Sequence, residues 1–119
     1  MNKIMCFEDL EIWKEGMRLC SEIYQLLRDC NDYGFRDQIR RSSVSIPSNI
    51  SEGYERKSNK EFVHFLYIAK GSCGEMRTQL YLAIDFGYIT TEKGKELIER
   101  SKRLSAMLTN YIKVRIEKF

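Results

Sequence analysis

The chain has 119 residues, 43% of them hydrophobic and 31% charged, which is enough for one domain built around a single core. One proline, seven glycines and no low-complexity tract argue against disorder and against a fold of many turns. The longest apolar run, residues 62–69, cannot span a membrane and no signal peptide is recognisable. We therefore expect a cytoplasmic protein with no membrane partner.

The formal net charge is +3, and the charges are distributed unevenly along the chain. Residues 1–30 carry four basic and six acidic side chains, whereas residues 91–119 carry eight basic and four acidic ones. The four cysteines contain no Cys-x-x-Cys pair, so we expect free thiols rather than disulfides.

Apolar residues recur at helical spacing between about residues 8 and 30, which predicts the first helix. They occupy two neighbouring stripes and give this helix a very wide apolar face. A polar stripe is expected to face solvent, and its members are Glu11, Glu15, Arg18, Glu22, Gln25 and Asp29.

Residues 35–55 form the second predicted helix, and Pro47 is the anomaly within it. Proline lacks the N–H that continues the hydrogen-bond ladder and costs about 3 kcal/mol inside a helix. We therefore predict a kink or a broken ladder between Ser43 and Pro47. The serines around Pro47 are small enough to accept a closely packed helix.

Ser58 and Glu61 form a capping-box pattern, which predicts the start of a third helix over residues 58–86. Two apolar stripes nearly surround this helix, so few of its positions are expected at the solvent edge. Those positions are His64, Gly71, Thr78 and Asp85.

A fourth helix is predicted over residues 91–117, capped by Thr90 or Thr91. Two pairs of opposite charge stand four residues apart on it, a spacing that favours surface ion pairs within the helix. These pairs are Glu96 with Arg100 and Glu99 with Arg103. Four long helices joined by short turns must pack as antiparallel neighbours. The predicted fold is an all-α, antiparallel, up-down-up-down, left-handed four-helix bundle.

Polar residues of the second and third helices are predicted to meet inside the bundle. If these helices fold back about a turn centred near Arg56, Glu75 stands level with the arginines that begin the second helix. A carboxylate in an apolar setting is costly unless it is paired. We therefore predict that Glu75 bonds Arg41, or else Arg40, and that Ser72 assists.

Three further residues belong to this predicted polar network: Gln38, Asn49 and Glu52. Gln38 lies on the polar stripe of the second helix, close to Arg41. Asn49 and Glu52 are placed to bond backbone groups released by Pro47 or side chains of the first helix. The network either only holds the bundle in register or lines a ligand or catalytic pocket, and the residues alone leave both interpretations open.

The sequence offers little for catalysis or metal binding. Glu61 and His64 match the Glu-x-x-His spacing of di-iron bundles, but such a site needs two copies and this is the single histidine. No cysteine has a histidine at predictable proximity, the serines of the second helix lack a triad partner, and no glycine-rich phosphate loop occurs. We expect no enzyme, no metal site and no cofactor, with a metalloenzyme as the least favoured class.

Positive charge is the remaining functional signal. Arginines cluster in the second helix, further cations surround the turn after it, and others follow on the last helix. They are Arg36, Arg40 and Arg41, then Arg56, Lys57 and Lys60, and finally Lys93, Lys95, Lys102, Lys113, Arg115 and Lys118. Such cations suit the phosphate backbone of a nucleic acid, but they are equally typical of a solvated surface. The tyrosines do not distinguish nucleic-acid binding from the other interpretations, because they are equally suited to a protein interface.

Several motifs coincide with those of a known family. They are Phe7-x-Asp9-Leu10-x-x-Trp13, Gln38-Ile39-Arg40-Arg41, Ser45-Ile46-Pro47-Ser48-Asn49-Ile50-Ser51-Glu52-Gly53 and Gly71-Ser72-x-x-Glu75. Over essentially its whole length the chain resembles the 23S rRNA-intervening-sequence proteins, with Ser51 where alanine is expected. The resemblance implies a small bacterial four-helix bundle of largely undefined molecular role. Related bundles are accessory proteins of diversity-generating retroelements, which implies a ring-shaped homopentamer that engages nucleic acid and a reverse transcriptase.

The resulting hypothesis is a non-enzymatic homo-oligomer, a pentamer by the resemblance, that binds RNA or DNA. Phosphate contacts are assigned to Arg36, Arg40, Lys57 and Lys60. The wide apolar faces of the first and third helices favour self-association independently, because one monomer core cannot cover both faces of each. The alternative is a protein-interaction scaffold without nucleic-acid binding.

Overall fold

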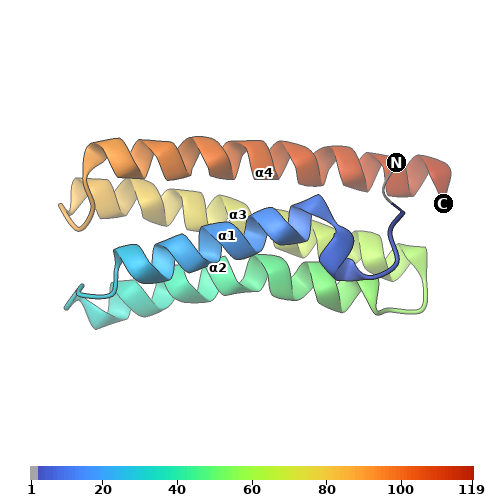
Figure 1. The fold of residues 1–119 in the computed structure, drawn as a ribbon, viewed down its shortest axis with the longest axis horizontal. Helices are drawn as coiled ribbons and strands as arrows, with labels where there is room; N and C mark the ends of the chain where they lie inside the picture. The colour runs from blue at the N-terminus through green and yellow to red at the C-terminus, as the bar shows by residue number, and fades with distance from the viewer. Residues whose placement is uncertain (1–2) are drawn as a thin grey trace.

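The computed structural model describes residues 3–119, which form four α-helices and one short 3-10 helix. The α-helices are α1 (Glu11–Leu26), α2 (Tyr33–Tyr54), α3 (Asn59–Asp85) and α4 (Thr91–Lys118), and η1 (Phe7–Asp9) precedes them. Figure 1 shows consecutive helices running in opposite directions along one long axis, with the C-terminus at the same end as the α2–α3 turn. The prediction of an all-α four-helix bundle is confirmed, while its handedness stays a prediction.

The first helix is shorter than its apolar pattern suggested. Leu10 has extended backbone angles, φ −76° and ψ 127°, and so separates η1 from α1. The Asp9 carboxylate accepts a hydrogen bond from the Met5 N–H at 2.9 Å, which fixes the chain before this break. Apolar spacing continues through the break because Leu10 is still buried, and periodicity alone therefore could not locate the helix start.

Side-chain caps set the starts of the other three helices. Ser58 Oγ accepts from the Glu61 N–H at 3.1 Å and donates to the Glu61 carboxylate at 3.3 Å, so the predicted capping interaction is confirmed. Thr90, not Thr91, caps α4 by accepting from the Lys93 N–H at 3.2 Å. Asp32 caps α2 in the same way, which moves the start of α2 to Tyr33.

The helix α2 continues through Pro47 without interruption. Proline has no N–H, so the carbonyl of Ser43 loses its backbone donor, but the ladder is broken only at that one bond. Side chains add hydrogen bonds to neighbouring carbonyls: Ser43 Oγ donates to Arg40 O at 2.9 Å, and Asn49 Nδ2 donates to Ser45 O at 2.8 Å. Pro47 itself is buried, next to Gly16 of α1.

One hydrophobic core extends through the bundle, and all four helices contribute to it. Its largest fully buried side chains are Leu19, Ile23, Leu27, Ile39, Ile46, Ile50, Leu66, Met76, Leu80, Leu97, Leu104 and Leu108. All four cysteines are free thiols, as expected, and burial raises the pKa of Cys73 to about 11. Within residues 3–119, no helix is long and apolar enough to cross a membrane.

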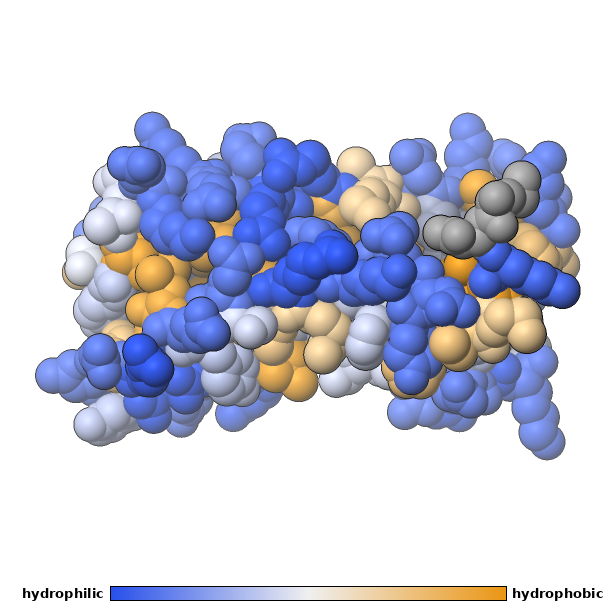
Figure 2. Space-filling view, in the orientation of Figure 1, coloured by the Kyte–Doolittle hydropathy of each residue, from blue (hydrophilic) through white to orange (hydrophobic). Residues whose placement is uncertain are grey.

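The solvent-facing side of α3 is broader and more apolar than predicted. The four expected positions, His64, Gly71, Thr78 and Asp85, are all exposed. So are Tyr67, Ile68, Glu75, Tyr81 and Leu82. The α3 stripe that was expected to be packed all round thus faces solvent in part, because only two of the other helices, α2 and α4, pack against α3. On the face shown in Figure 2, hydrophilic residues form a band across the middle, with apolar areas on both sides of it.

Helices α2 and α3 approach closely at Gly53. A Cβ added to this buried glycine would lie 2.6 Å from Phe65 Cβ and 3.0 Å from Phe62 Cδ1. We predict that Gly53→Ala lowers the free energy of unfolding by about 1–3 kcal/mol, because the helices must move apart. Urea denaturation followed by circular dichroism measures this change.

Gly71→Ala is the matched control, since a Cβ added to Gly71 of α3 would meet no atom within 4 Å. It should raise the free energy of unfolding by about 0.5–1 kcal/mol, because alanine loses less backbone entropy in a helix. Equal stabilities of the two variants would contradict the close approach at Gly53.

Candidate nucleic-acid interface

The four cations predicted to contact phosphate lie in two separate places. Arg36 and Arg40 belong to the first half of α2, whereas Lys57 and Lys60 lie at the α2–α3 turn. Arg40 and Lys57 are separated by seventeen residues, which corresponds to about 25 Å at the rise of a helix. The structure therefore groups these cations in pairs and does not bring all four together.

Arg36 and Arg40 are partly engaged by their neighbours. The Arg36 guanidinium lies over the Tyr33 ring, 4.8 Å from its centroid, and its Nε is 3.8 Å from the Asp37 carboxylate. The Arg40 guanidinium lies 4.4 Å from the Tyr24 ring centroid and donates to the Tyr24 carbonyl at 3.4 Å. Both side chains are half-buried, so only part of each guanidinium is available to a ligand.

Lys57 and Lys60 are exposed, and neither forms an ion pair with another described residue. With Arg56 and Arg115 they make up what we call the basic end of the bundle. A pocket of about 320 Å³ opens there, and Arg56, Lys57, Asn59 and Arg115 contribute to its wall. Arg115 is fixed by a reciprocal pair of bonds: its Nε donates to Asn59 Oδ1 at 2.8 Å, and Asn59 Nδ2 donates to its carbonyl at 2.9 Å.

The predicted bond between Glu75 and Arg41 is wrong. Both side chains are exposed, and Glu75 forms no ion pair with any of residues 3–119. The position facing α2 is instead taken by Gln79, which is 7% exposed and accepts a hydrogen bond of 2.6 Å from Ser42 Oγ. Ser72, expected to assist Glu75, lies 2.8 Å from the hydroxyl of Ser45.

The assumed centre of the α2–α3 turn was misplaced, but this alone does not explain the missing bond. The Ser42–Gln79 and Ser45–Ser72 contacts place the centre of this hairpin near residues 59 and 60, three to four positions beyond Arg56. A shift of the centre moves the facing position by twice as much, so Glu75 stands level with residues 42–46 rather than with residue 37. Arg41 is still within about one turn of that level, and the two side chains do not meet because both lie on exposed helix faces.

The other members of the predicted polar network are equally dispersed. Asn49 bonds the carbonyl and the hydroxyl of Ser45, one turn earlier in its own helix, rather than the carbonyl freed by Pro47. Glu52 is exposed and pairs with Arg56 at 3.2 Å, and Gln38 is exposed. What remains is a small cluster of hydroxyl and amide groups between α2 and α3, without an internal ion pair.

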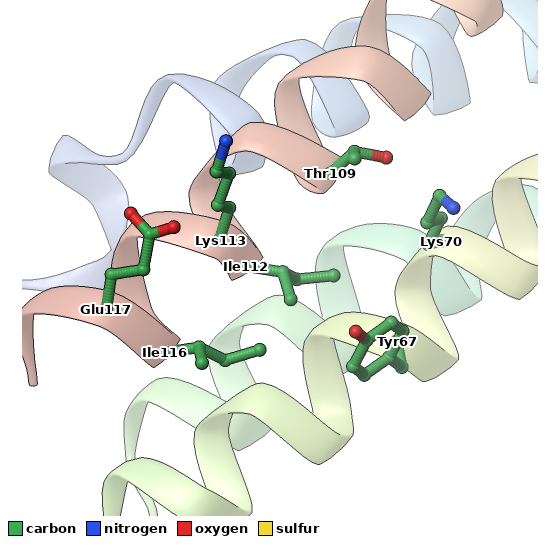
Figure 3. A pocket seen from close by; sticks show the side chains of 7 residues that line it. All are labelled: Tyr67, Lys70, Thr109, Ile112, Lys113, Ile116 and Glu117. Atoms are coloured by element: carbon green, nitrogen blue, oxygen red, sulfur yellow. The ribbon is translucent and has the colours of Figure 1, made fainter.

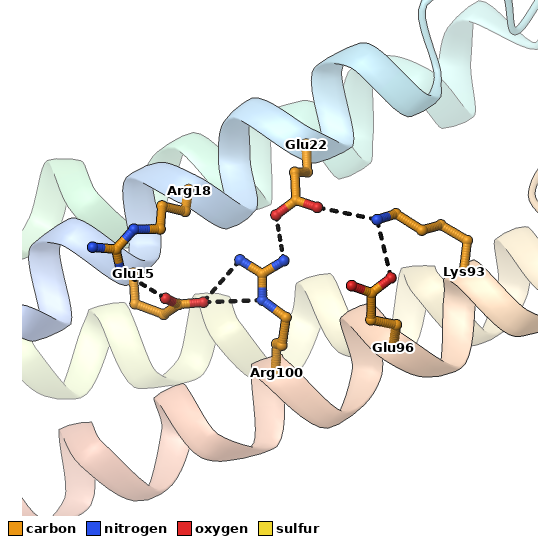
Figure 4. Close-up of polar contacts among 6 residues, drawn as sticks. All are labelled: Glu15, Arg18, Glu22, Lys93, Glu96 and Arg100. Atoms are coloured by element: carbon orange, nitrogen blue, oxygen red, sulfur yellow. Dashed lines mark hydrogen bonds and ion pairs between the residues drawn. The ribbon is translucent and has the colours of Figure 1, made fainter.

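The main charged network of the bundle joins α1 to α4 (Figure 4). Arg100 Nε and Nη2 donate to Glu15 Oε1 at 3.1 and 3.0 Å, and its Nη1 bonds Glu22. Lys93 Nζ lies 3.1 Å from Glu22 and 3.0 Å from Glu96. We call this the α1–α4 charge network; its members are Glu15, Arg18, Glu22, Lys93, Glu96 and Arg100.

Local spacing rules predicted different partners for these residues. Arg100 pairs across the bundle and not with Glu96, and Glu99 pairs with Lys102 at 3.2 Å rather than with Arg103. A signal was nevertheless present in the sequence. Glu15 and Glu22 stand seven residues apart on one helix, and Lys93 and Arg100 repeat this spacing with opposite charge on another. A shared seven-residue interval places each pair on one helix face.

The network lowers the pKa of Glu22. Partial burial raises this pKa, but hydrogen bonds from Arg100 and Lys93 outweigh the burial and hold it below its usual value of 4.5. Lys93 and Arg100 are thus engaged by the carboxylates of α1 and are not available to a ligand.

The residues considered for metal binding have other roles. Glu61 caps α3 and lies 3.7 Å from Arg56, while His64 is exposed with its ring edge-on to Phe65. In the part of the chain that the structure describes, no group of three metal-binding side chains comes together.

A model of the 23S rRNA-intervening sequence protein family matches residues 8–110. The chain belongs to this family. Its bundle is similar to the crystal structure of a protein with unknown function from the S23 ribosomal protein family of Bacteroides thetaiotaomicron VPI-5482. That similarity has a TM-score of 0.80 and 27% sequence identity over 86% of this chain and 98% of that chain. No curated protein matches the chain.

The family assignment confirms the resemblance that the sequence motifs indicated. The match covers α1, α2 and α3 completely and α4 as far as residue 110, and it includes both pairs of predicted phosphate-binding cations. The relation to accessory proteins of retroelements stays a prediction.

In this family member, Arg100→Ala tests the α1–α4 charge network. The Arg100 side chain is 17% exposed, and its removal leaves two half-buried carboxylates with reduced pairing. We predict that the free energy of unfolding falls by about 2 kcal/mol, between the values typical of exposed and of buried ion pairs. Arg18→Ala, which removes an exposed partner of Glu15, should change it by less than about 0.5 kcal/mol. Equal losses from both variants would contradict a special role of Arg100.

The lowered pKa of Glu22 predicts a pH dependence of stability. A carboxyl group with a depressed pKa in the folded state stabilises the protein above its unfolded pKa, and this contribution is lost as the pH falls through the folded value. The stability of the unmodified protein should therefore fall more steeply than that of Glu22→Gln between about pH 5 and pH 3. Urea titrations at several pH values measure this difference, and parallel curves would contradict the prediction.

Proposed function

We propose that this protein is a non-enzymatic, self-associating four-helix bundle that binds RNA or DNA through its exposed cations. The observation that carries the proposal is the basic end. There Lys57 lines a pocket together with Arg115, and Lys60 lies in the first turn of α3. Neither lysine has a carboxylate partner among the described residues. Cations without partners retain their full attraction for phosphate, and their binding releases the counterions held by the nucleic acid.

Arg36 and Arg40 form a second, weaker contact in this proposal. They lie about 25 Å from the basic end, which corresponds to roughly seven base pairs of a duplex at 3.4 Å per step. Tyrosine rings already hold both guanidinium groups, so their contribution is smaller than that of the two lysines. A nucleic acid that spans both contacts lies along α2.

Self-association is proposed from apolar side chains that the monomer leaves uncovered. Val44 of α2 is 39% exposed, and Ile68 and Leu82 of α3 are 38% and 39% exposed. Helices α2 and α3 pack on each other, and Ile68 and Leu82 are fourteen residues apart, a spacing that places them on one side of α3. Apolar side chains on one side of a small bundle are typical of a protein interface. A ring of five copies and a reverse transcriptase partner are what the family resemblance implies, and we propose both on that ground alone.

A non-enzymatic role is proposed because the polar side chains that meet in this bundle satisfy one another. Glu15 and Glu22 bind cations, Ser42 binds Gln79, and the thiol of Cys73 donates to the carbonyl of Ser101. Each of these contacts stabilises helix packing.

The double variant Lys57→Ala/Lys60→Ala tests the proposed function. Fluorescence anisotropy with a labelled RNA and a labelled DNA, over a range of salt concentrations, should show at least about tenfold weaker binding. The slope of log K against log salt should also become shallower by about 2, because two phosphate contacts are lost.

Lys14→Ala/Arg18→Ala is the matched control. It removes the same charge, but both residues already pair with carboxylates on α1. Its affinity should stay close to that of the unmodified protein, and light scattering on all variants separates loss of binding from loss of assembly. If the unmodified protein binds neither nucleic acid at low salt, the proposal fails in favour of a protein-interaction scaffold.

A further inference from the structure

A groove between α3 and α4 has features that the basic end lacks. Its pocket, of about 300 Å³, lies between Tyr67 and Lys70 of α3 and the C-terminal part of α4 (Figure 3). Figure 3 shows Ile112 and Ile116 extending from α4 toward the Tyr67 ring, with Lys113 on the same helix. An aromatic ring, an apolar floor and cations on both sides therefore surround one hollow.

The side chains of this pocket are available to a ligand. The Tyr67 ring is 53% exposed although it lies against an apolar surface, and Ile116 is 58% exposed. Neither Lys70 nor Lys113 forms an ion pair within residues 3–119. Glu117 is the one acidic side chain that lines the pocket, so lysines outnumber carboxylates at its wall.

Beyond the pocket, one face of α3 carries the same residue types. Tyr67, Lys70, Gly74, Arg77 and Tyr81 follow each other at spacings of three and four residues, which places them on one side of the helix. Tyr81 is 52% exposed, and a Cβ added to Gly74 would meet no atom within 4 Å. The two tyrosines are about 21 Å apart along the helix axis, with cations between them.

Helix α4 contributes a matching row of cations. Lys95, Lys102 and Lys113 recur at intervals that keep them near one face of α4, and Lys113 lines the pocket. The bond of 3.3 Å from Cys73 Sγ to Ser101 O sets the register, so that Lys102 stands next to the middle of the α3 row. Lys102 is paired with Glu99 at 3.2 Å, whereas Lys95 and Lys113 have no such partner among the described side chains.

We propose that the α3–α4 groove binds single-stranded nucleic acid, with one base stacked on Tyr67 in the pocket, a second on Tyr81, and phosphates on Lys70, Arg77 and Lys113. This inference rests on the proposed function and names its ligand. In a duplex the base faces are stacked on each other and mainly phosphates are accessible, so exposed aromatic rings would have no base to stack on. A single strand offers both phosphates and free base faces.

The Tyr67 pocket and the basic end lie close to each other along α3. Lys60 precedes Tyr67 by seven residues, two turns along the same face of α3. A strand that contacts Lys57 and Lys60 therefore reaches the Tyr67 pocket after about 10 Å. The lysines of the basic end and the Tyr67 pocket are therefore close enough to contact one nucleic-acid strand.

The test compares an oligonucleotide of twelve or so nucleotides, as a single strand and as a duplex, with 2-aminopurine as a reporter of stacking. The single strand should bind at least about tenfold more tightly than the duplex and quench the reporter. Tyr67→Ser should weaken single-strand binding by roughly 5- to 100-fold without changing the salt slope, since a ring and not a charge is lost. Tyr67→Phe keeps the ring and should bind like the unmodified protein.

Each contrary outcome identifies what has failed. No binding of either form by the unmodified protein overturns the proposed function and the groove with it. Salt-dependent binding that Lys57→Ala/Lys60→Ala weakens, but Tyr67→Ser and strand pairing leave unchanged, overturns the groove alone. If Tyr67→Ser instead alters the molar mass measured by light scattering, the groove is a contact between copies of the chain and the inference is wrong. Thermal melts of the exposed-site variants confirm that they are folded.

Discussion

The arrangement of charges in this bundle depends on the hydrogen bonds that the Arg100 guanidinium group forms with α1. Helices α1 and α4 pack less extensively on each other than the other neighbouring helices do, and α1 is the shortest of the four. A planar guanidinium can bond two carboxylates at once, and Arg100 uses this to hold Glu15 and Glu22 on α1. The first and last helices are thereby joined where apolar packing is weakest.

The same pairing decides which charges remain for function. Glu15 and Glu22 of α1 are paired with Lys93 and Arg100, which face α1 from one side of α4. Among the described residues, Lys95 and Lys113 of α4 and Lys57 and Lys60 near the α2–α3 turn have no carboxylate partner, whereas Lys102 and Arg56 are paired. A modest net charge of +3 therefore corresponds to a surface on which some cations are engaged by carboxylates and others are not.

Local sequence signals predicted the helices well, but they did not predict which side chains pair between helices. The caps at Ser58 and Thr90 and the apolar repeats fixed four helices, because these features act within a few residues. The predicted bond between Glu75 and Arg41 failed because both side chains lie on exposed helix faces, which the spacing did not reveal, although the centre of the turn was also misplaced. Each candidate cation could be named from the sequence, but only the packing shows which of them are engaged, as Arg36 and Arg40 are.

The position of the C-terminus has a practical consequence for any study of binding. Phe119, the last residue, lies under the Arg115 guanidinium, 3.8 Å from its carbon to the ring centroid. A purification tag fused after Phe119 would be tethered beside Lys57 and Lys60, and a polyanionic tag would compete there as an intramolecular ligand at high effective concentration. Affinities should therefore be compared before and after proteolytic removal of such a tag.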